Sequence, residues 1–309
     1  ITSDSLPPQA LPETSSGDQW NITIGGVDLH SIQLTYVDDV SGLIALLHIG
    51  RLKLSIDTFD LVKNQFHVDD ASIEHTRVSL LQTKESPVEE STPSDLDIGV
   101  GTVSLKQVHV TYENTVSGER YAANVSNSQI AAEKISLPNH SIAIKSVQLD
   151  SSTFSIASKR IPEDSKKQLS DSAGIDWVIS LQRLQLKSNS VQYDIVNDTV
   201  INGFDPSHIF MKGVSVDAEK IYFSEQQLGA TVSHLSFVEE SGFTLLELSG
   251  KVIMDSLHAA LEDVLIQTPS SIIQQNIVLT YPSLSVLHND IGNATDNVRV
   301  NESTISVSD

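Results

Sequence analysis

The chain contains no cysteine, which excludes structural disulfides and thiolate metal sites. Aromatic residues make up only 5% of the 309 residues, so few large rings are available for the centre of a thick core. No apolar run reaches the roughly 18 residues that a membrane-spanning helix needs. Basic residues are also few, with 19 Lys and Arg against 40 Asp and Glu. The net charge of −21 therefore disfavours nucleic acid and simple adsorption to anionic lipid headgroups.

Catalytic motifs are missing as well. The sequence has no glycine-rich phosphate loop, no nucleophile elbow and no helix with paired histidines. We predict that the chain is not an enzyme, uses no cofactor and holds no metal. The ten histidines are scattered, and we interpret His30 and His109 as exposed strand residues rather than ligands. The chain opens at Ile1 without a signal peptide or initiator Met, so we expect a mature or excised fragment.

What the sequence does contain is an internal repeat. Four copies of one apolar pattern begin at Trp20, Leu96, Trp177 and Leu257, at spacings of 76, 81 and 80 residues. In the first three copies hydrophobic side chains recur at offsets 0, 2, 4, 7, 9, 12, 14 and 16, with Asn189 as the one polar exception. The fourth copy is weaker. The residues in between are nearly all polar or glycine, and such alternation is typical of a strand with one apolar face.

In each copy two neighbouring apolar positions are three residues apart instead of two. In a regular strand, the apolar residues after such a step would lie on the other face of the sheet. A β-bulge would keep the apolar set on one side, and Gly25-Gly26 fall on the first such step. A strand break with a short turn is the alternative, and the spacing does not separate the two. Bulges bend a sheet, so we predict an all-β, strongly curved antiparallel sheet with few helices. Residues 253–266 fit a helix or the repeat, and we favour strand; residues 43–54 are equally ambiguous.

The organisation follows from the repeat. We predict a disordered or extended lead over residues 1–18 and one elongated repetitive β domain over 19–309. Its four units start near 20, 96, 177 and 257. The polar stretches 84–95 and 160–174 each precede a unit and read as loops. Either stretch is a possible domain boundary, although a curved sheet could continue across both.

The apolar face needs a cover, because exposed apolar sheet is costly. A second sheet, helices or a ligand would each serve. Helices are scarce, and branched aliphatics on an incurving sheet can line a long trough. Such a trough suits lipid acyl chains, which need only non-directional apolar contact. Trp20 and Trp177 occupy equivalent positions, which we interpret as core positions rather than as a stacking platform.

Several short motifs resemble one known family. The alternation of apolar and polar residues in the repeats is similar to the pattern of that family. Five short motifs add to the likeness: Phe204-Asp-Pro-Ser-His-Ile209, Leu235-Ser-Phe-Val-Glu-Glu-Ser-Gly-Phe243-x-Leu245, Leu265-Ile-Gln-Thr-Pro-Ser-Ser271, Leu279-x-Tyr281 and Asn301-Glu-Ser-Thr-Ile-Ser-Val-Ser-Asp309. This pattern resembles the AsmA-like superfamily, in particular the TamB-type inner-membrane subunit of the translocation and assembly module in Bacteroidetes-like bacteria. The likeness is best over 175–309 and looser over 20–160.

The resemblance implies a very large periplasmic protein with an N-terminal inner-membrane anchor. It implies a U-shaped β-sheet around a hydrophobic groove that carries phospholipid between membranes. It also implies a role in outer-membrane biogenesis, with an outer-membrane barrel protein of the module as a partner. The family has no catalytic residues to carry over. This sequence departs from the family in showing no anchor and in stopping within the pattern, and both features fit a fragment.

We therefore predict a non-enzymatic segment whose hydrophobic groove shields phospholipid acyl chains. The alternative is an extracellular or surface β-sandwich for binding or adhesion, in which the same residues form a closed core. The residues predicted to line the groove are Ile22, Ile24, Val27, Leu29, Ile98, Val100, Val103, Leu105, Ile179, Leu181, Leu184 and Leu186.

Overall fold

The computed structural model describes residues 24–60, 64–85, 97–136, 139–160, 177–283, 295–301 and 303–306. All regular structure within these ranges is β. The strands are β1 (Gly26–Asp38), β2 (Leu43–Asp60), β3 (Gln65–Gln82), β4 (Asp97–Asn114), β5 (Arg120–Ser136), β6 (Ser141–Asp150), β7 (Thr153–Ser158), β8 (Val178–Ile195), β9 (His208–Phe223), β10 (Leu228–Glu239), β11 (Thr244–Leu245), β12 (Glu247–Met254), β13 (His258–Gln267), β14 (Ile272–Thr280) and β15 (Thr295–Val300).

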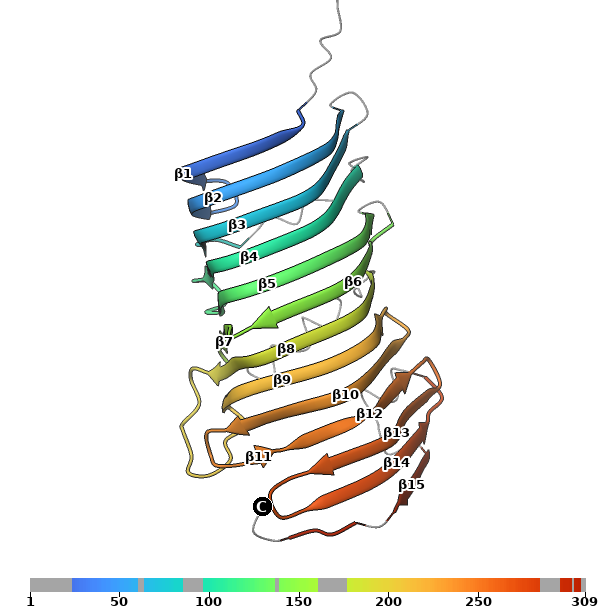
Figure 1. Cartoon of the computed structure of the whole chain (residues 1–309). Helices are drawn as coiled ribbons and strands as arrows, with labels where there is room; N and C mark the ends of the chain where they lie inside the picture. Colours follow the sequence, from blue (N-terminus) through green and yellow to red (C-terminus); the bar gives the residue numbers. More distant parts are fainter. Residues whose placement is uncertain are drawn as a thin grey trace, which may run out of the picture.

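These strands form one 15-stranded sheet. The order along the sheet is β1-β2-β3-β4-β5-β6-β8-β9-β10-β12-β13-β14-β15, with β7 beside β5 and β8 and β11 beside β10. Figure 1 shows the strands side by side in one long sheet, and the long strands bend near one end. The predicted all-β, curved and repetitive sheet is confirmed.

The sheet is mixed rather than purely antiparallel, which corrects one part of the prediction. Strand β3 runs parallel to β4, and β6 and β7 run parallel to β8. These parallel pairs fall at the starts of the second and third repeat copies, and the remaining pairs are antiparallel. The sheet continues across both polar stretches, because strands on either side of each stretch are hydrogen-bonded neighbours.

A parallel junction requires the chain to return along the whole strand. Gln65 faces Asp97 and Gln82 faces Asn114, so the return from β3 to β4 covers a full strand length. The long strands of the sheet bend near one end (Figure 1).

The bend follows a line of left-handed residues across the sheet, which we name the crease. Ser31, His75, Gln107 and Ser188 adopt φ values of 55°, 50°, 53° and 53° in β1, β3, β4 and β8. Gly50 lies in the same line on β2, and a Cβ there would lie 2.6 Å from the His75 carbonyl oxygen. The strands run unbroken through these residues, so the second three-residue step of the first three copies is not a strand break. From β1 to β5 the pairing has the same register on both sides of the crease, and only the β8–β9 pair shows the register shift of a bulge, around Asn189.

The fourth copy departs from this pattern. Its ladder enters β13, but the strand ends at Gln267 and a turn follows, closed by the Thr268 N–H on the Ser271 carbonyl at 3.0 Å. The second three-residue step is a turn here and not a bulge. Residues 253–266 divide between β12 and β13, so the prediction of strand for this segment is confirmed. Residues 43–54, for which the sequence left helix and strand open, belong to β2.

Candidate functional site: the apolar face of the sheet

The register between strands aligns the apolar positions of different copies into rows. Partners in a strand pair share one face of the sheet, so each row can be followed from one pair to the next. The parallel junctions keep the register, and the rows therefore cross from one repeat copy to the next without a shift. We name the face that carries these rows the apolar face, and the opposite one the polar face.

One row is aliphatic from β1 to β10. It consists of Val27, Leu54, Ala71, Val103, Ile130, Val147, Leu184, Ala218 and Val232. A second row has one polar member, Ser128, and consists of Leu29, Leu52, Ile73, Leu105, Ser128, Leu149, Leu186, Val216 and Leu235.

Two more rows lie beyond the crease. One consists of Leu34, Leu47, Val78, Val110, Ala123, Phe154, Val191 and Met211. The other consists of Tyr36, Ala45, Leu80, Tyr112, Tyr121, Ile156, Tyr193 and Ile209. The rings of Tyr112 and Tyr121 stack with centroids 5.9 Å apart.

The rows contain six of the twelve predicted lining residues: Val27, Leu29, Val103, Leu105, Leu184 and Leu186. Val27 and Leu29 lie in β1, and the remaining eight in strands lie in β4 and β8. Beyond the first three-residue step apolar residues still pair with apolar residues, as in Val68–Val100 and Leu181–Ile221. Ile24 precedes β1, and Ile22 lies outside the described residues.

The return strands supply about as much of the apolar face as the predicted ladders, and their residues were not named. Leu52 and Leu54 of β2 lie opposite Leu29 and Val27. The sequence shows these as alternating residues, but their face depends on the pairing register, which has no local signal. Ile44 of β2 pairs with Val37 and lies on the polar face.

Side chains next to the crease on the apolar face are buried. Thr76, Val108, Val125 and Asn189 are 5%, 7%, 9% and 1% exposed. All the described strands belong to one sheet, so no second sheet explains this burial. We infer that the sheet bends toward its apolar face, which brings the two halves of that face together at the crease.

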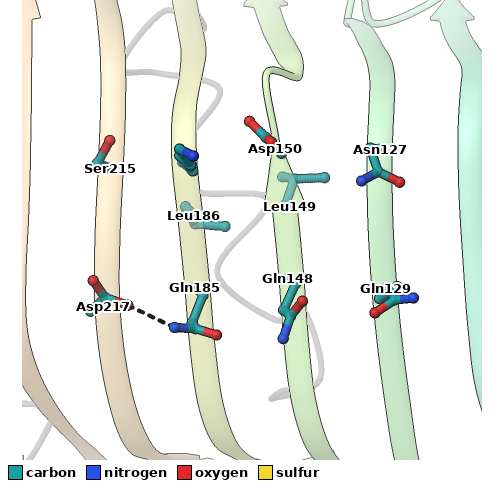
Figure 2. A pocket seen from close by; sticks show the side chains of 10 residues that line it. Asn127, Gln129, Gln148, Leu149, Asp150, Gln185, Leu186, Ser215 and Asp217 are labelled. Carbon is teal, nitrogen blue, oxygen red and sulfur yellow. Dashed lines mark hydrogen bonds between the residues drawn. The ribbon is translucent and has the colours of Figure 1, made fainter.

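The polar face carries hydrogen-bonding side chains in the same registers. Figure 2 shows Gln129, Gln148, Gln185 and Asp217 projecting from β5, β6, β8 and β9 as one row. The Gln185 amide donates to the Asp217 carboxylate at 3.2 Å. These residues line a shallow hollow of about 390 Å³. Nothing in this set pairs a nucleophile with a general base, so it suggests solvation or polar binding rather than catalysis.

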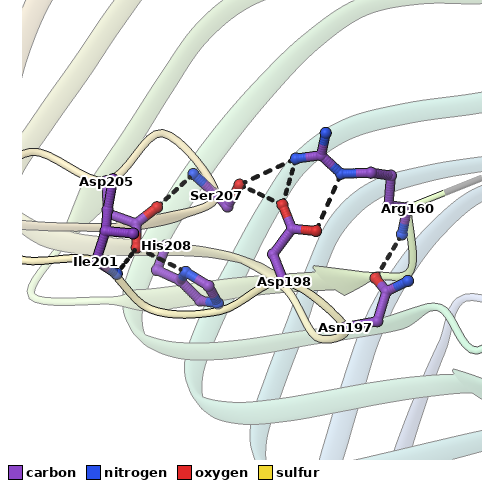
Figure 3. Close-up of polar contacts among 7 residues, drawn as sticks. All are labelled: Arg160, Asn197, Asp198, Ile201, Asp205, Ser207 and His208. Carbon is purple, nitrogen blue, oxygen red and sulfur yellow. Dashed lines mark hydrogen bonds and ion pairs between the residues drawn. The ribbon is translucent and has the colours of Figure 1, made fainter.

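A compact polar cluster joins β7 to the β8–β9 connection (Figure 3). The Asp198 carboxylate accepts hydrogen bonds from Arg160 and, at 2.6 Å, from the Ser207 hydroxyl. The Arg160 guanidinium and then the Ser207 hydroxyl hold the pKa of Asp198 below its usual range. The Arg160 N–H donates to Asn197 Oδ1 at 2.7 Å. The cluster fixes where the chain leaves β7, which is a structural role.

Asp205 closes the same connection from the other side. Its carboxylate accepts the Ile201 N–H at 2.9 Å and the Ser207 N–H at 3.0 Å, and it lies 3.0 Å from His208 Nδ1. The backbone hydrogen bond from Ile201 is the main cause that lowers the pKa of Asp205. Because every carboxylate oxygen here serves the fold of the loop, the arrangement offers no free acid or base.

Metal ligands and membrane-spanning helices are two further kinds of functional feature. Among the described residues, no group of three or more His, Cys, Asp or Glu is placed to hold a metal ion. Within the same ranges no helix is long and apolar enough to cross a membrane. Trp177 is half-buried and stacks on His140 with centroids 5.4 Å apart, while its counterpart Trp20 lies outside the described residues.

Comparisons with known proteins give no family. No protein-family model matches the chain. A search of curated proteins finds no match either.

Proposed function

We propose that the apolar face forms a hydrophobic groove that shields lipid acyl chains. The chain would then be a non-enzymatic segment of an AsmA/TamB-like protein that moves lipid between membranes and supports outer-membrane biogenesis. The observation that carries the proposal is the set of apolar rows that continue from strand to strand across the sheet, from β1 to β9 or β10.

The direction of the rows supports this use. They run across the strands, along the length of the ladder, and the longest row covers about 38 Å at the usual spacing of about 4.8 Å between strands. This exceeds the roughly 30 Å hydrocarbon thickness of a bilayer. An acyl chain lying along the rows would contact Val, Leu, Ile and Ala side chains throughout, and each contact is non-directional.

The rival function is a closed β-sandwich for surface binding or adhesion. That fold needs a second sheet against the apolar face. The described strands form one sheet and no second one, which favours the lipid-binding proposal over the sandwich.

Location and partner follow from the family resemblance alone. The proposal places the segment in the periplasm, as part of a protein anchored in the inner membrane. It gives phospholipid acyl chains as the ligand and an outer-membrane barrel protein of the assembly module as a protein partner. A pull-down of envelope extracts with this segment, compared with Leu184→Asp, tests the second partner.

The test of lipid binding uses two neighbouring positions on opposite faces. A photo-crosslinking amino acid is placed at Leu184 on the apolar face or at Gln185 on the polar face, and phospholipid adducts are measured by mass spectrometry. We expect adducts at position 184 and few at 185. Equal labelling at both positions, or the absence of phospholipid from the purified protein, would contradict the proposal.

Aspartate substitutions give a second measurement. Val103→Asp and Leu184→Asp should weaken lipid crosslinking several-fold, whereas Gln185→Asp should leave it unchanged, because only the first two place a charge against acyl chains. Circular dichroism melting separates the rival. In a closed core the two apolar substitutions would unfold the protein instead, since a buried unpaired charge is costly.

A further inference from the structure

A row of histidine and arginine side chains crosses the polar face on the first strands of the ladder. It consists of Gln33, His48, Arg77, His109 and Asn124, one from each of β1 to β5, paired in a continuous register. The row lies directly beside the crease, on the face opposite the apolar rows. Its chemistry is therefore independent of acyl-chain binding.

The amides at the two ends of the row orient the imidazoles. The Gln33 side-chain nitrogen lies 3.0 Å from His48 Nε2, and an amide NH₂ only donates, so Nε2 accepts and the proton of the neutral ring lies on Nδ1. At the other end His109 Nδ1 bonds to the Asn124 carbonyl oxygen, which only accepts. Each ring is thus held on one side of Arg77.

Arg77 is exposed and makes no ion pair or side-chain hydrogen bond with any residue that the structure describes. Three arginines in the described ranges form ion pairs: Arg51 with Asp28 at 3.0 Å, Arg120 with Glu113 at 2.9 Å, and Arg160 with Asp198. Arg183 and Arg299 resemble Arg77 in forming none with described residues, but only Arg77 has a histidine paired with it on each flanking strand.

The neighbouring rows add no net positive charge. Across the crease, the next row carries His30, Arg51, Glu74 and Lys106. Arg51 is paired with Asp28, so Glu74 and Lys106 remain as one acid and one base. The row on the other side of the histidines is uncharged, since it begins with Thr35, Leu46, Ser79 and Thr111 and ends with Ala122.

The side chains of the row line a hollow. It has a volume of about 330 Å³ and is lined by His48, His75, Thr76, Arg77, Gln107 and His109. His75 and Gln107 are left-handed residues of the crease, so the crease also shapes this site.

We propose that this hollow is a binding site for a phosphate-type oxyanion, either a free phosphate or the headgroup of a phospholipid. Guanidinium matches such an anion with two parallel N–H groups. The strands that carry His48 and His109 flank β3 at the usual spacing of about 4.8 Å. The His48 Nδ1–H is not used by Gln33 and donates to one of the remaining oxygens.

The test titrates the whole chain with sodium sulfate and with sodium phosphate, followed by the imidazole NMR signals of His48 and His109. Arg77→Gln should weaken binding at least tenfold. Arg183→Gln is the matched control, because Arg183 is an exposed cation on the polar face of β8, away from the hollow. His48→Asn should weaken binding less than Arg77→Gln does, because it removes one donor and leaves the guanidinium.

A second arm distinguishes the source of the anion. Flotation with phosphatidylcholine vesicles, with and without phosphatidylglycerol, tests whether the chain prefers a headgroup that lacks a balancing cation. Binding of the free ions assigns a soluble ligand, and binding of the anionic vesicles alone assigns a headgroup. Failure of both, or equal losses in Arg77→Gln and Arg183→Gln, would overturn the proposal, since the binding would then be absent or due to net charge.

Discussion

Asn189 is a polar residue at a position that the first two copies fill with Ile32 and Val108. It is 1% exposed, and both ends of its amide are bonded. Its Oδ1 accepts the Ser152 N–H at 2.8 Å, and its Nδ2 donates to the Leu149 carbonyl at 3.2 Å. Beside Asn189, the last strand of the second unit is interrupted between β6 and β7. The asparagine side chain hydrogen-bonds backbone groups that a continuous strand would have paired with its neighbour.

Glu239 has a similar role at the end of β10. It is 5% exposed, and burial by itself raises the pKa of a carboxyl. Hydrogen bonds from the hydroxyl and the N–H of Ser241, the latter at 2.7 Å, and from the Phe210 N–H at 3.3 Å outweigh that effect. The pKa of Glu239 therefore lies below its ordinary value, so the charged form stabilises this end of the sheet.

A pH-dependent loss of stability follows for Glu239. Because its pKa is lower in the folded chain, its contribution is present above about pH 4.3 and disappears as the pH falls through the folded value. Glu239→Gln should lower the free energy of unfolding by about 1–2 kcal/mol at pH 7, and by less at about pH 3. Urea unfolding at both pH values measures this.

The neighbouring residue supplies the control. Glu240 is exposed and lies 3.7 Å from Lys212, so Glu240→Gln should change stability by less than about 0.5 kcal/mol. A Glu239→Gln effect of the same size at both pH values would show that the lost interaction does not depend on the carboxylate charge.

At the scale of the strands, the crease explains how long alternating ladders become a bent sheet. Left-handed backbone costs a residue other than glycine about 1–2 kcal/mol. Ser188 pays this cost at a φ of 53°, and its N–H is bonded to the Ser215 hydroxyl at 3.2 Å. The bend is therefore held against a local preference for straight strand, and the packing of the apolar face at the crease is the compensating term.

Relief of that local cost should stabilise the strand. Ser188→Gly is expected to raise the free energy of unfolding by up to about 1 kcal/mol, because glycine adopts the left-handed conformation without strain. Ser190→Gly, two residues along the same strand and without a left-handed φ, should lower it by about 0.5–1 kcal/mol. Urea unfolding of both variants checks the prediction, and a change of the same sign in both would refute the strain argument.

The sequence predicted the strands and their apolar side because alternation is local information. It could not decide between bulge and break, since both give the same spacing of apolar residues. The fourth copy shows the difference: Pro269 stands where Ile32 and Val108 stand in the first two copies, and a residue without an N–H cannot continue the ladder. Strand direction was missed because the parallel pairing of β3 and β4 depends on the long return between them.

The candidate site was predicted in part for the same reason. The lining residues in β1, β4 and β8 were predicted because they occupy the apolar positions of the repeat. Leu54 and Ala71, which continue the row of Val27, have no comparable mark, and only the register between strands assigns their face. The histidine row was interpreted as a set of scattered surface residues, because His48 and His109 are far apart in the sequence and meet only through β3.

As a whole, the molecule is a one-dimensional stack in which each strand contacts only its neighbours. Stability in such a stack is a sum over adjacent pairs, so it should fall toward the two ends. The ends differ from the middle in exposure. Tyr36 and Leu34 of β1 are 52% and 54% exposed, whereas their counterparts Tyr112 and Val110 of β4 are half-buried between two strands.

Hydrogen exchange should therefore report a gradient along the ladder. Among the described strands, β1 pairs only with β2 and β15 only with β14, while β4 and β8 have a neighbour on each side. We expect hydrogen-bonded amides of β1 and β15 to exchange at least about tenfold faster than those of β4 and β8, an opening free energy lower by about 1.4 kcal/mol. Strand β4 is the internal control, because β1 and β4 are copies of one repeat. Equal protection of β1 and β4 would contradict the gradient and would mean that a further strand covers the edge of β1 in solution.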